Sequence, residues 1–214
     1  MSTLQPYFTP ETIETRSFAI IDSEVPEPRP FAGAEWEIAR RLVHTTADFD
    51  LLNHLVIHPL AIQAGTAALA RGCRIFTDTE MARSGIPVRR TDPLGCTVQC
   101  LLNRPDVVAR AREQGTTRAH AAMDAATAEL GNAIIVIGNA PTALIRLIDH
   151  LRSGGPAPAL VVGMPVGFVN AAESKELLLE QHVVPYITIR GRKGGSPLAA
   201  ATVNALAEMV LRRS

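Results

Sequence analysis

The chain has 214 residues, 47% of them hydrophobic, which is enough to bury one full-sized core as a single domain over residues 1–214. Its 21 basic and 21 acidic side chains balance, which argues against nucleic acid or an anionic membrane as a partner held by net charge. No apolar run approaches the roughly 20 residues of a membrane helix, and the N-terminus does not resemble a secretion signal, so we expect a cytoplasmic protein.

Three helices are predicted in the first third of the chain. A hydroxyl at Thr9 followed by Pro10 is typical of a helix start, and apolar residues continue to Pro26. Apolar side chains at three- and four-residue spacing predict a second amphipathic helix, with His44 in its last turn. An alanine-rich third helix is ended by Gly72. The expected ranges are 9–26, 33–46 and 59–71.

Beyond Gly72, short β-prone apolar runs alternate with longer helical segments. The runs are too uniformly apolar for strands with one wet face, so they predict a parallel sheet buried on both sides. This pattern indicates an α/β protein, a three-layer α/β/α sandwich with extra N-terminal helices. The strands are expected at 73–77, 96–101, 133–137, 160–163 and 185–190, and the helices at 105–114, 117–130, 141–152, 171–181 and 197–212.

Metal and disulfide chemistry are not indicated. Three cysteines without a C-x-x-C pair are expected to be reduced, buried thiols. His54 and His58 would share a face if they lay on a helix, but the glutamate of H-E-x-x-H is missing and Pro59 follows at once. No metal site is therefore expected.

Two loops follow predicted strands at the edge of the sheet where ligands bind, beyond the carboxyl ends of the strands. The Gly138 turn, residues 138–142, precedes a helix whose free amides would favour an anion, but the same residues also form ordinary tight turns. Both interpretations remain open. The glycine loop, residues 190–196, combines three cations with three glycines before a helix, which favours binding of carboxylates or phosphates.

Common catalytic and nucleotide-binding motifs are absent. The lysine of the glycine loop precedes the Gly194-Gly195 pair instead of following a glycine, so the loop is not a P-loop, and neither G-x-G-x-x-G nor G-x-S-x-G occurs. His44 lies where the helix macrodipole favours an imidazolium, so its local sequence allows a structural as well as a catalytic role.

Four segments together carry a family resemblance: residues 14–21, 138–144, 163–176 and 190–196. Shorter matches surround His44, Asp78 and Arg118. In this order along essentially the whole chain, they resemble the precorrin-8X methylmutases of cobalamin biosynthesis. The resemblance implies an isomerase that moves a methyl group from C-11 to C-12 of precorrin-8X to give hydrogenobyrinic acid. The cobalt-containing equivalent would give cobyrinic acid, and the residues do not separate the two substrates.

The resemblance also implies a flavodoxin-like sheet of five parallel strands, a homodimer and hand-over of the tetrapyrrole to neighbouring enzymes of the pathway. It implies no cofactor, and no nucleic-acid or membrane partner. Two rivals stay open: a non-catalytic corrin carrier, and a regulatory domain that binds flavin or phosphate. The match at His44 favours the enzyme over the carrier, because a carrier needs no proton donor.

Site residues follow from the same resemblance. His44 matches the catalytic histidine, and a histidine side chain, whose ordinary pKa is about 6.5, suits a general acid that protonates a ring nitrogen. Arg16 and Ser17 lie on the first helix and would complete the pocket by folding across it or by reaching into a partner subunit. The residues expected to bind the acetate and propionate groups of the substrate are Arg16, Ser17, Arg118, Asn139, Thr142, Arg190, Arg192, Gly194 and Ser196.

Overall fold

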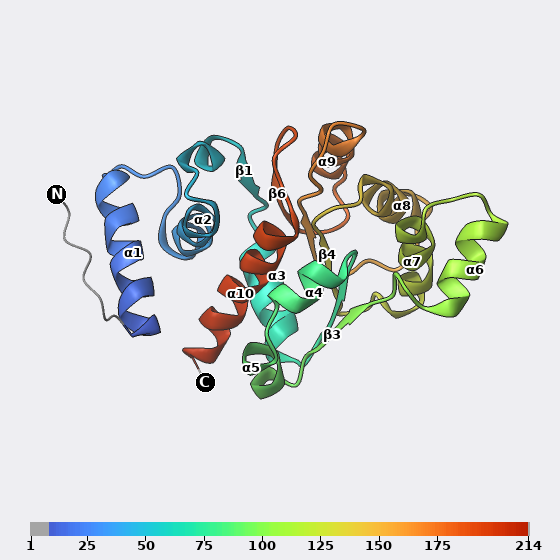
Figure 1. Ribbon diagram of the computed structural model, residues 1–214, viewed down its shortest axis with the longest axis horizontal. Helices are drawn as coiled ribbons and strands as arrows, with labels where there is room; N and C mark the ends of the chain where they lie inside the picture. The colour runs from blue at the N-terminus through green and yellow to red at the C-terminus, as the bar shows by residue number, and fades with distance from the viewer. Residues whose placement is uncertain (1–8, 214) are drawn as a thin grey trace.

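The computed structural model describes residues 9–213, which form a mixed α/β protein with one six-stranded sheet between two groups of helices (Figure 1). Across the sheet the strand order is β1-β6-β5-β4-β2-β3. The strands are β1 (Leu55–Ile57), β2 (Arg74–Thr77), β3 (Thr97–Cys100), β4 (Ile134–Ile137), β5 (Leu160–Gly163) and β6 (Tyr186–Ile189).

All five predicted strands are confirmed and run parallel to one another, within two residues of the expected bounds. The expected number of strands was wrong by one, because β1 adds a sixth, antiparallel to β6 with Leu55 opposite Ile189. The segment between His54 and His58 is therefore a strand, so the two histidines do not lie on a helix. The three residues between them are β-branched or apolar and complete the edge of the sheet.

The sheet separates two apolar cores, as the uniformly apolar runs predict. Along β4, Ile134 and Val136 join one core, while Ile135 and Ile137 join the other, and all four are fully buried. This alternation is expected of a strand covered by helices on both faces. The edge strand β3 departs from the prediction, since Thr97 and Gln99 are exposed there.

Helices α2 (Gly33–Thr46), α3 (Ala61–Ala70) and α10 (Ser196–Leu211) pack together on one face of the sheet, and α1 (Pro10–Glu24) packs outside α2. In Figure 1 this group lies to the left and centre, and the helices of the other face lie to the right. Those helices are α6 (Pro105–Glu113), α7 (Arg118–Ala126), α8 (Pro141–Arg152) and α9 (Ala171–Glu180).

The eight predicted helices are confirmed, with ends shifted by four residues or fewer. Two short helices were not predicted: α4 (Glu80–Gly85), which begins with the Thr79 hydroxyl accepting from the Ala82 amide at 3.1 Å, and α5 (Val88–Thr91). Residues 9–213 also contain three short 3₁₀ segments, at 49–53, 92–94 and 127–129. Between residues 9 and 213, no helix is long and apolar enough to cross a membrane.

The cysteines are free thiols, of which Cys73 and Cys96 are buried and Cys100 is half-buried. The Sγ atoms of Cys73 and Cys96 lie 3.9 Å apart at the beginnings of two neighbouring strands. The contact with the Cys96 thiol, together with burial, raises the pKa of the Cys73 thiol. The prediction of buried thiols is thus confirmed for two of the three.

Candidate functional site

The Gly138 turn and the glycine loop touch each other at the carboxyl edge of the sheet. A Cβ on Gly138 would lie 2.5 Å from the Cα of Ser196, so a side chain at this position would push the two segments apart. Gly194 is equally constrained, because its Cβ would collide with the carbonyl oxygen of Met164. The Gly195 amide donates to that same oxygen at 2.9 Å. Backbone packing therefore makes one continuous surface of loops that are far apart in sequence.

The Asp78 carboxylate is the hydrogen-bond acceptor for backbone amides of the Gly138 turn. It accepts N–H bonds from Gly138 at 2.9 Å, Asn139 at 2.8 Å and Ala140 at 2.7 Å. Burial raises the pKa of the Asp78 carboxyl, while these three N–H groups act in the opposite direction. The anion at this helix start is thus a side chain of the protein, so the amides of Gly138, Asn139 and Ala140 already have an acceptor. The sequence signal for this internal acceptor is an acidic residue directly after the first parallel strand.

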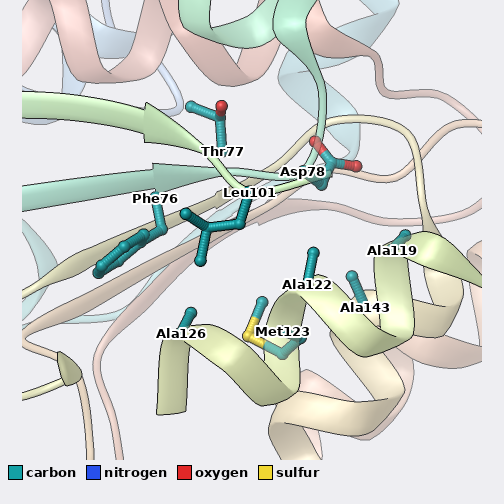
Figure 2. A pocket seen from close by; sticks show the side chains of 9 residues that line it. All are labelled: Phe76, Thr77, Asp78, Leu101, Ala119, Ala122, Met123, Ala126 and Ala143. Atoms are coloured by element: carbon teal, nitrogen blue, oxygen red, sulfur yellow. The ribbon is translucent and has the colours of Figure 1, made fainter. Parts of the chain in front are cut away.

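Below Asp78 the space between β2, β3 and α7 is almost filled. Figure 2 shows Phe76, Leu101 and Met123 turned into a small apolar hollow, with the Asp78 carboxylate at its margin. The hollow measures about 10 Å³, room for one water molecule at most. A ligand of any size must therefore lie over the edge of the sheet, outside this hollow.

Three predicted binding residues lie in the Gly138 turn or next to it. The hydroxyl oxygens of Thr117 and Thr142 are 2.8 Å apart, so the starts of α7 and α8 meet there. Next to Thr117, Arg118 donates from Nη1 to Oδ1 of Asn103 at 2.9 Å. Arg118 and Asn139 are exposed, so both can reach a ligand. The predicted set did not include Asn103 and Thr117, which orient these groups.

His44 lies in the last turn of α2, half-buried between two open hollows. His44 shares the first hollow, of about 270 Å³, with Ser17 of α1 in the same chain. The second, about 280 Å³, has small residues such as Gly85 and Ala200 in its lining. Pro197, which follows the glycine loop, lines the second hollow as well, so His44 and the loop border one surface.

Ser17 lies on α1, which packs against α2, and it lines the same hollow as His44 within one chain. Its hydroxyl donates to the Ile13 carbonyl at 2.8 Å. Arg16 is exposed on the same helix, and it is not among the residues that line the hollow.

The second hollow also contains residues that the sequence did not single out. Arg41 and Arg90 line it, and they are paired with Glu14 and with Glu208, the latter at 2.9 Å. Arg41 lies three residues before His44, so the helical spacing of the predicted second helix could have indicated it.

The three cations of the glycine loop have different surroundings. Arg190 pairs with Glu176 at 2.7 Å, and Lys193 pairs with two aspartates. The Arg192 guanidinium lies 5.3 Å from the centroid of the Phe168 ring, and the described part of the chain gives it no salt bridge. Phe168 is 82% exposed, so this side of the loop is open. Arg192 is the loop cation best placed to bind a ligand carboxylate.

Replacing Arg192 by alanine is expected to weaken binding of an acidic ligand more at low salt than at high salt. The lost contact is electrostatic and exposed, and added salt screens it because the Debye length shortens, to about 10 Å at 0.1 M. Titrations with a polycarboxylate tetrapyrrole at two salt concentrations measure the effect. A loss of affinity that does not depend on salt would indicate a distorted loop instead.

Lys175 lies beneath the glycine loop and was not identified from the sequence. Its side chain is fully buried on α9, and Nζ donates to the carbonyl oxygen of Lys193 at 2.6 Å. Burial lowers the pKa of Lys175 from 10.5 to about 8.

The buried amine predicts a pH dependence of stability. Between about pH 8 and 10.5 the unfolded chain holds a proton at Lys175 that the folded chain has lost, so this group makes stability rise with pH. The gain is at most on the order of 3 kcal/mol. Urea unfolding of the wild type and of Lys175→Met at pH 7 and pH 10 should show it as a change in their difference. A constant difference would contradict the lowered pKa.

The exposed Arg118 and Arg192, with His44 nearby, give this α/β protein a surface suited to an acidic ligand. Residues 12–209 match the sequence profile of the family described as precorrin-8X methylmutase. The chain is 48% identical to the cobalt-precorrin-8 methylmutase of Salmonella typhimurium and 44% identical to the precorrin-8X methylmutase of Pseudomonas aeruginosa. Each alignment covers 92% of this chain and 94% of the relative.

A solved structure described as precorrin-8x methyl mutase from Thermus thermophilus has the same fold. It matches with a TM-score of 0.88 and 42% identity, over 95% of this chain and 97% of the other. The chain belongs to the precorrin-8X methylmutase family, which makes it an isomerase. The resemblance seen in the four sequence segments is thereby confirmed.

Proposed function

We propose that the protein moves the methyl group of precorrin-8X from C-11 to C-12, with His44 as the general acid. The observation that carries this proposal is the position of His44. It is the histidine that lines both open hollows, and it borders the same surface as the glycine loop. The family supports the isomerisation, and the non-catalytic carrier is the less favoured alternative.

In the proposed mechanism, His44 donates a proton to a ring nitrogen of the macrocycle. The protonated ring draws electron density as the C-11–methyl bond breaks and the C-12–methyl bond forms. Because substrate and product are isomers, the proton must be recovered before release, so the neutral imidazole then acts as the base. The half-buried ring packs edge-on against Phe18 at 5.3 Å between centroids, which limits its freedom to turn.

The substrate carboxylates are assigned to groups along the carboxyl edge. Arg118, Asn139 and Thr142 would hold one side of the macrocycle, and Arg192 with the glycine-loop residues Gly194 and Ser196 would hold the middle. Ser17 would act near His44, where it lines the same hollow. Arg16 and Arg190 are further candidates at the margin of this surface. Neither hollow beside His44 can enclose a whole tetrapyrrole, so the ring would lie across them.

Further parts of the proposal concern the whole protein. The order of the five parallel strands, 2-1-3-4-5 when counted along the chain, supports a flavodoxin-like assignment. Both cores share one sheet, which supports a single domain over residues 1–214. We also propose a cytoplasmic homodimer that hands its product to the next enzyme of the pathway. Gel filtration with light scattering tests the dimer, and cell fractionation tests the location.

The decisive experiment is a visible-absorption assay with metal-free precorrin-8X and, separately, with its cobalt complex. Formation of the corrin chromophore from either substrate would establish the methylmutase and identify which form it uses. Binding of both substrates without any spectral conversion would overturn the proposal in favour of the carrier.

A further inference from the structure

Lys193 joins the glycine loop to the segment that follows α2. Its Nζ atom donates to Oδ2 of Asp48 at 2.6 Å and to Oδ2 of Asp50 at 2.8 Å. Both aspartates come within six residues of His44, just after the left-handed Ala47 that ends the helix. The Asp48 carboxylate also accepts from the Asp50 amide at 3.0 Å, which holds the two acids in one turn. One side chain thus spans from the glycine loop to the end of the helix that carries His44.

The backbone of Lys193 is fixed from below at the same time. Its carbonyl oxygen accepts the 2.6 Å bond from Lys175, whose side chain is fully buried. The next residue, Gly194, packs against the Met164 carbonyl without room for a side chain. The base of the Lys193 side chain is therefore held in place, and its ammonium group reaches outward to the two aspartates.

The charges around Lys193 argue against a direct contact with the substrate. Two carboxylates already neutralise one ammonium, and the bonds to Asp48 and Asp50 raise the pKa of Lys193. The bond from Lys193 lowers the pKa of Asp50 to about 2, so both acids are ionised at neutral pH. A substrate carboxylate approaching Lys193 would meet net negative charge. Exposed ion pairs also add little stability, so a contribution to overall folding is a weak explanation for the two bonds from Lys193.

We propose that Lys193 is a positioning residue that holds the glycine loop at a fixed distance from the end of the His44 helix. The loop binds carboxylates of the substrate and His44 protonates its ring, so their separation decides whether the proton donor meets the correct nitrogen. This inference rests on the proposed function of both groups. It assigns to Lys193 a task that differs from that of its neighbour Arg192.

The test compares three variants: Lys193→Met, the double variant Asp48→Asn with Asp50→Asn, and all three changes together. Lys193→Met is expected to lower kcat about tenfold while the Kd of the product changes less than about threefold. The double variant should do the same, and the triple variant should be no worse than either, because all three break one connection. Lys193→Arg should restore most of kcat, since a guanidinium can bridge two carboxylates.

Lys193 would instead be a substrate contact if Lys193→Met weakened product binding as much as turnover and the asparagine variant left both unchanged. That result would overturn the proposal. Arg74→Met is the matched control: it removes an exposed ion pair, with Glu129, from the opposite edge of the sheet, and kcat should not change.

Hydrogen exchange of the protein without ligand separates this proposal from the proposed function. Lys193→Met should speed amide exchange in residues 47–53 as well as in 190–196, whether or not the protein turns over precorrin-8X. Unchanged exchange in residues 47–53 would refute the connection even in an active enzyme. An inactive wild type in which both segments respond to Lys193→Met would refute the proposed function and leave the connection standing.

Discussion

His44→Ala is expected to abolish turnover of precorrin-8X while leaving product affinity within about tenfold, or about 1.4 kcal/mol. The substitution removes the proton donor, but the arginines and loop amides that would bind the carboxylates lie on other segments. Isothermal titration with product and the absorption assay with substrate measure the two quantities on one preparation. Added imidazole should restore part of the rate by entering the enlarged hollow.

His182→Ala is the matched control for this experiment. His182 is an exposed histidine just before β6, at the opposite edge of the sheet, so its loss should leave both rate and affinity unchanged. Full activity of His44→Ala would show that His44 has only a structural role at the end of α2. Loss of affinity by a hundredfold or more would make it a binding residue.

Asp78→Ala is expected to reduce the free energy of unfolding by about 3 kcal/mol or more. The change leaves the amides of Gly138, Asn139 and Ala140 without their acceptor, two of them buried, and each unsatisfied buried group costs about 1–3 kcal/mol. Urea unfolding followed by circular dichroism measures the loss. Asp78→Asn keeps one acceptor oxygen and should fall between the wild type and the alanine variant.

Asp106→Ala provides the comparison, because Asp106 lies in the first turn of α6, is exposed and forms an ion pair with Arg104 at 2.6 Å. Its loss should cost much less stability than the loss of Asp78, because exposed ion pairs add little to folding. If Asp78→Ala were no more damaging than Asp106→Ala, water would have to replace the carboxylate in the Gly138 turn.

The parallel part of the fold was predictable because its signals are local. Strands such as β4 are buried on both faces and therefore read as unbroken apolar runs, and prolines at the first turn mark the starts of α6, α8 and α10. The strand β1 gave no such signal. It is only three residues long, and its partner β6 lies about 130 residues further along the chain. No local sequence pattern therefore indicates that the two strands pair.

The site was predictable in part. The glycine loop stands out by composition and position, whereas His44 needed the family resemblance, since its own helix end allows a structural role as well. The parts played by Lys175 and Asp78 depend on contacts with segments distant in sequence. Lys175 looks like an ordinary polar residue of an amphipathic helix, and it is buried only because the glycine loop closes over it.

The carboxylate of Asp78 also has a consequence for selectivity. In many sheets of this architecture, the amides of such a turn attract phosphate groups, which abundant metabolites and flavin nucleotides carry. Here a tethered acid occupies that place permanently, and no free phosphate competes well with a group held at so high an effective concentration. The protein can thus offer its arginines to a scarce tetrapyrrole without its edge being occupied by common nucleotides. A designer who wanted a nucleotide-binding version of this scaffold would have to remove Asp78 first.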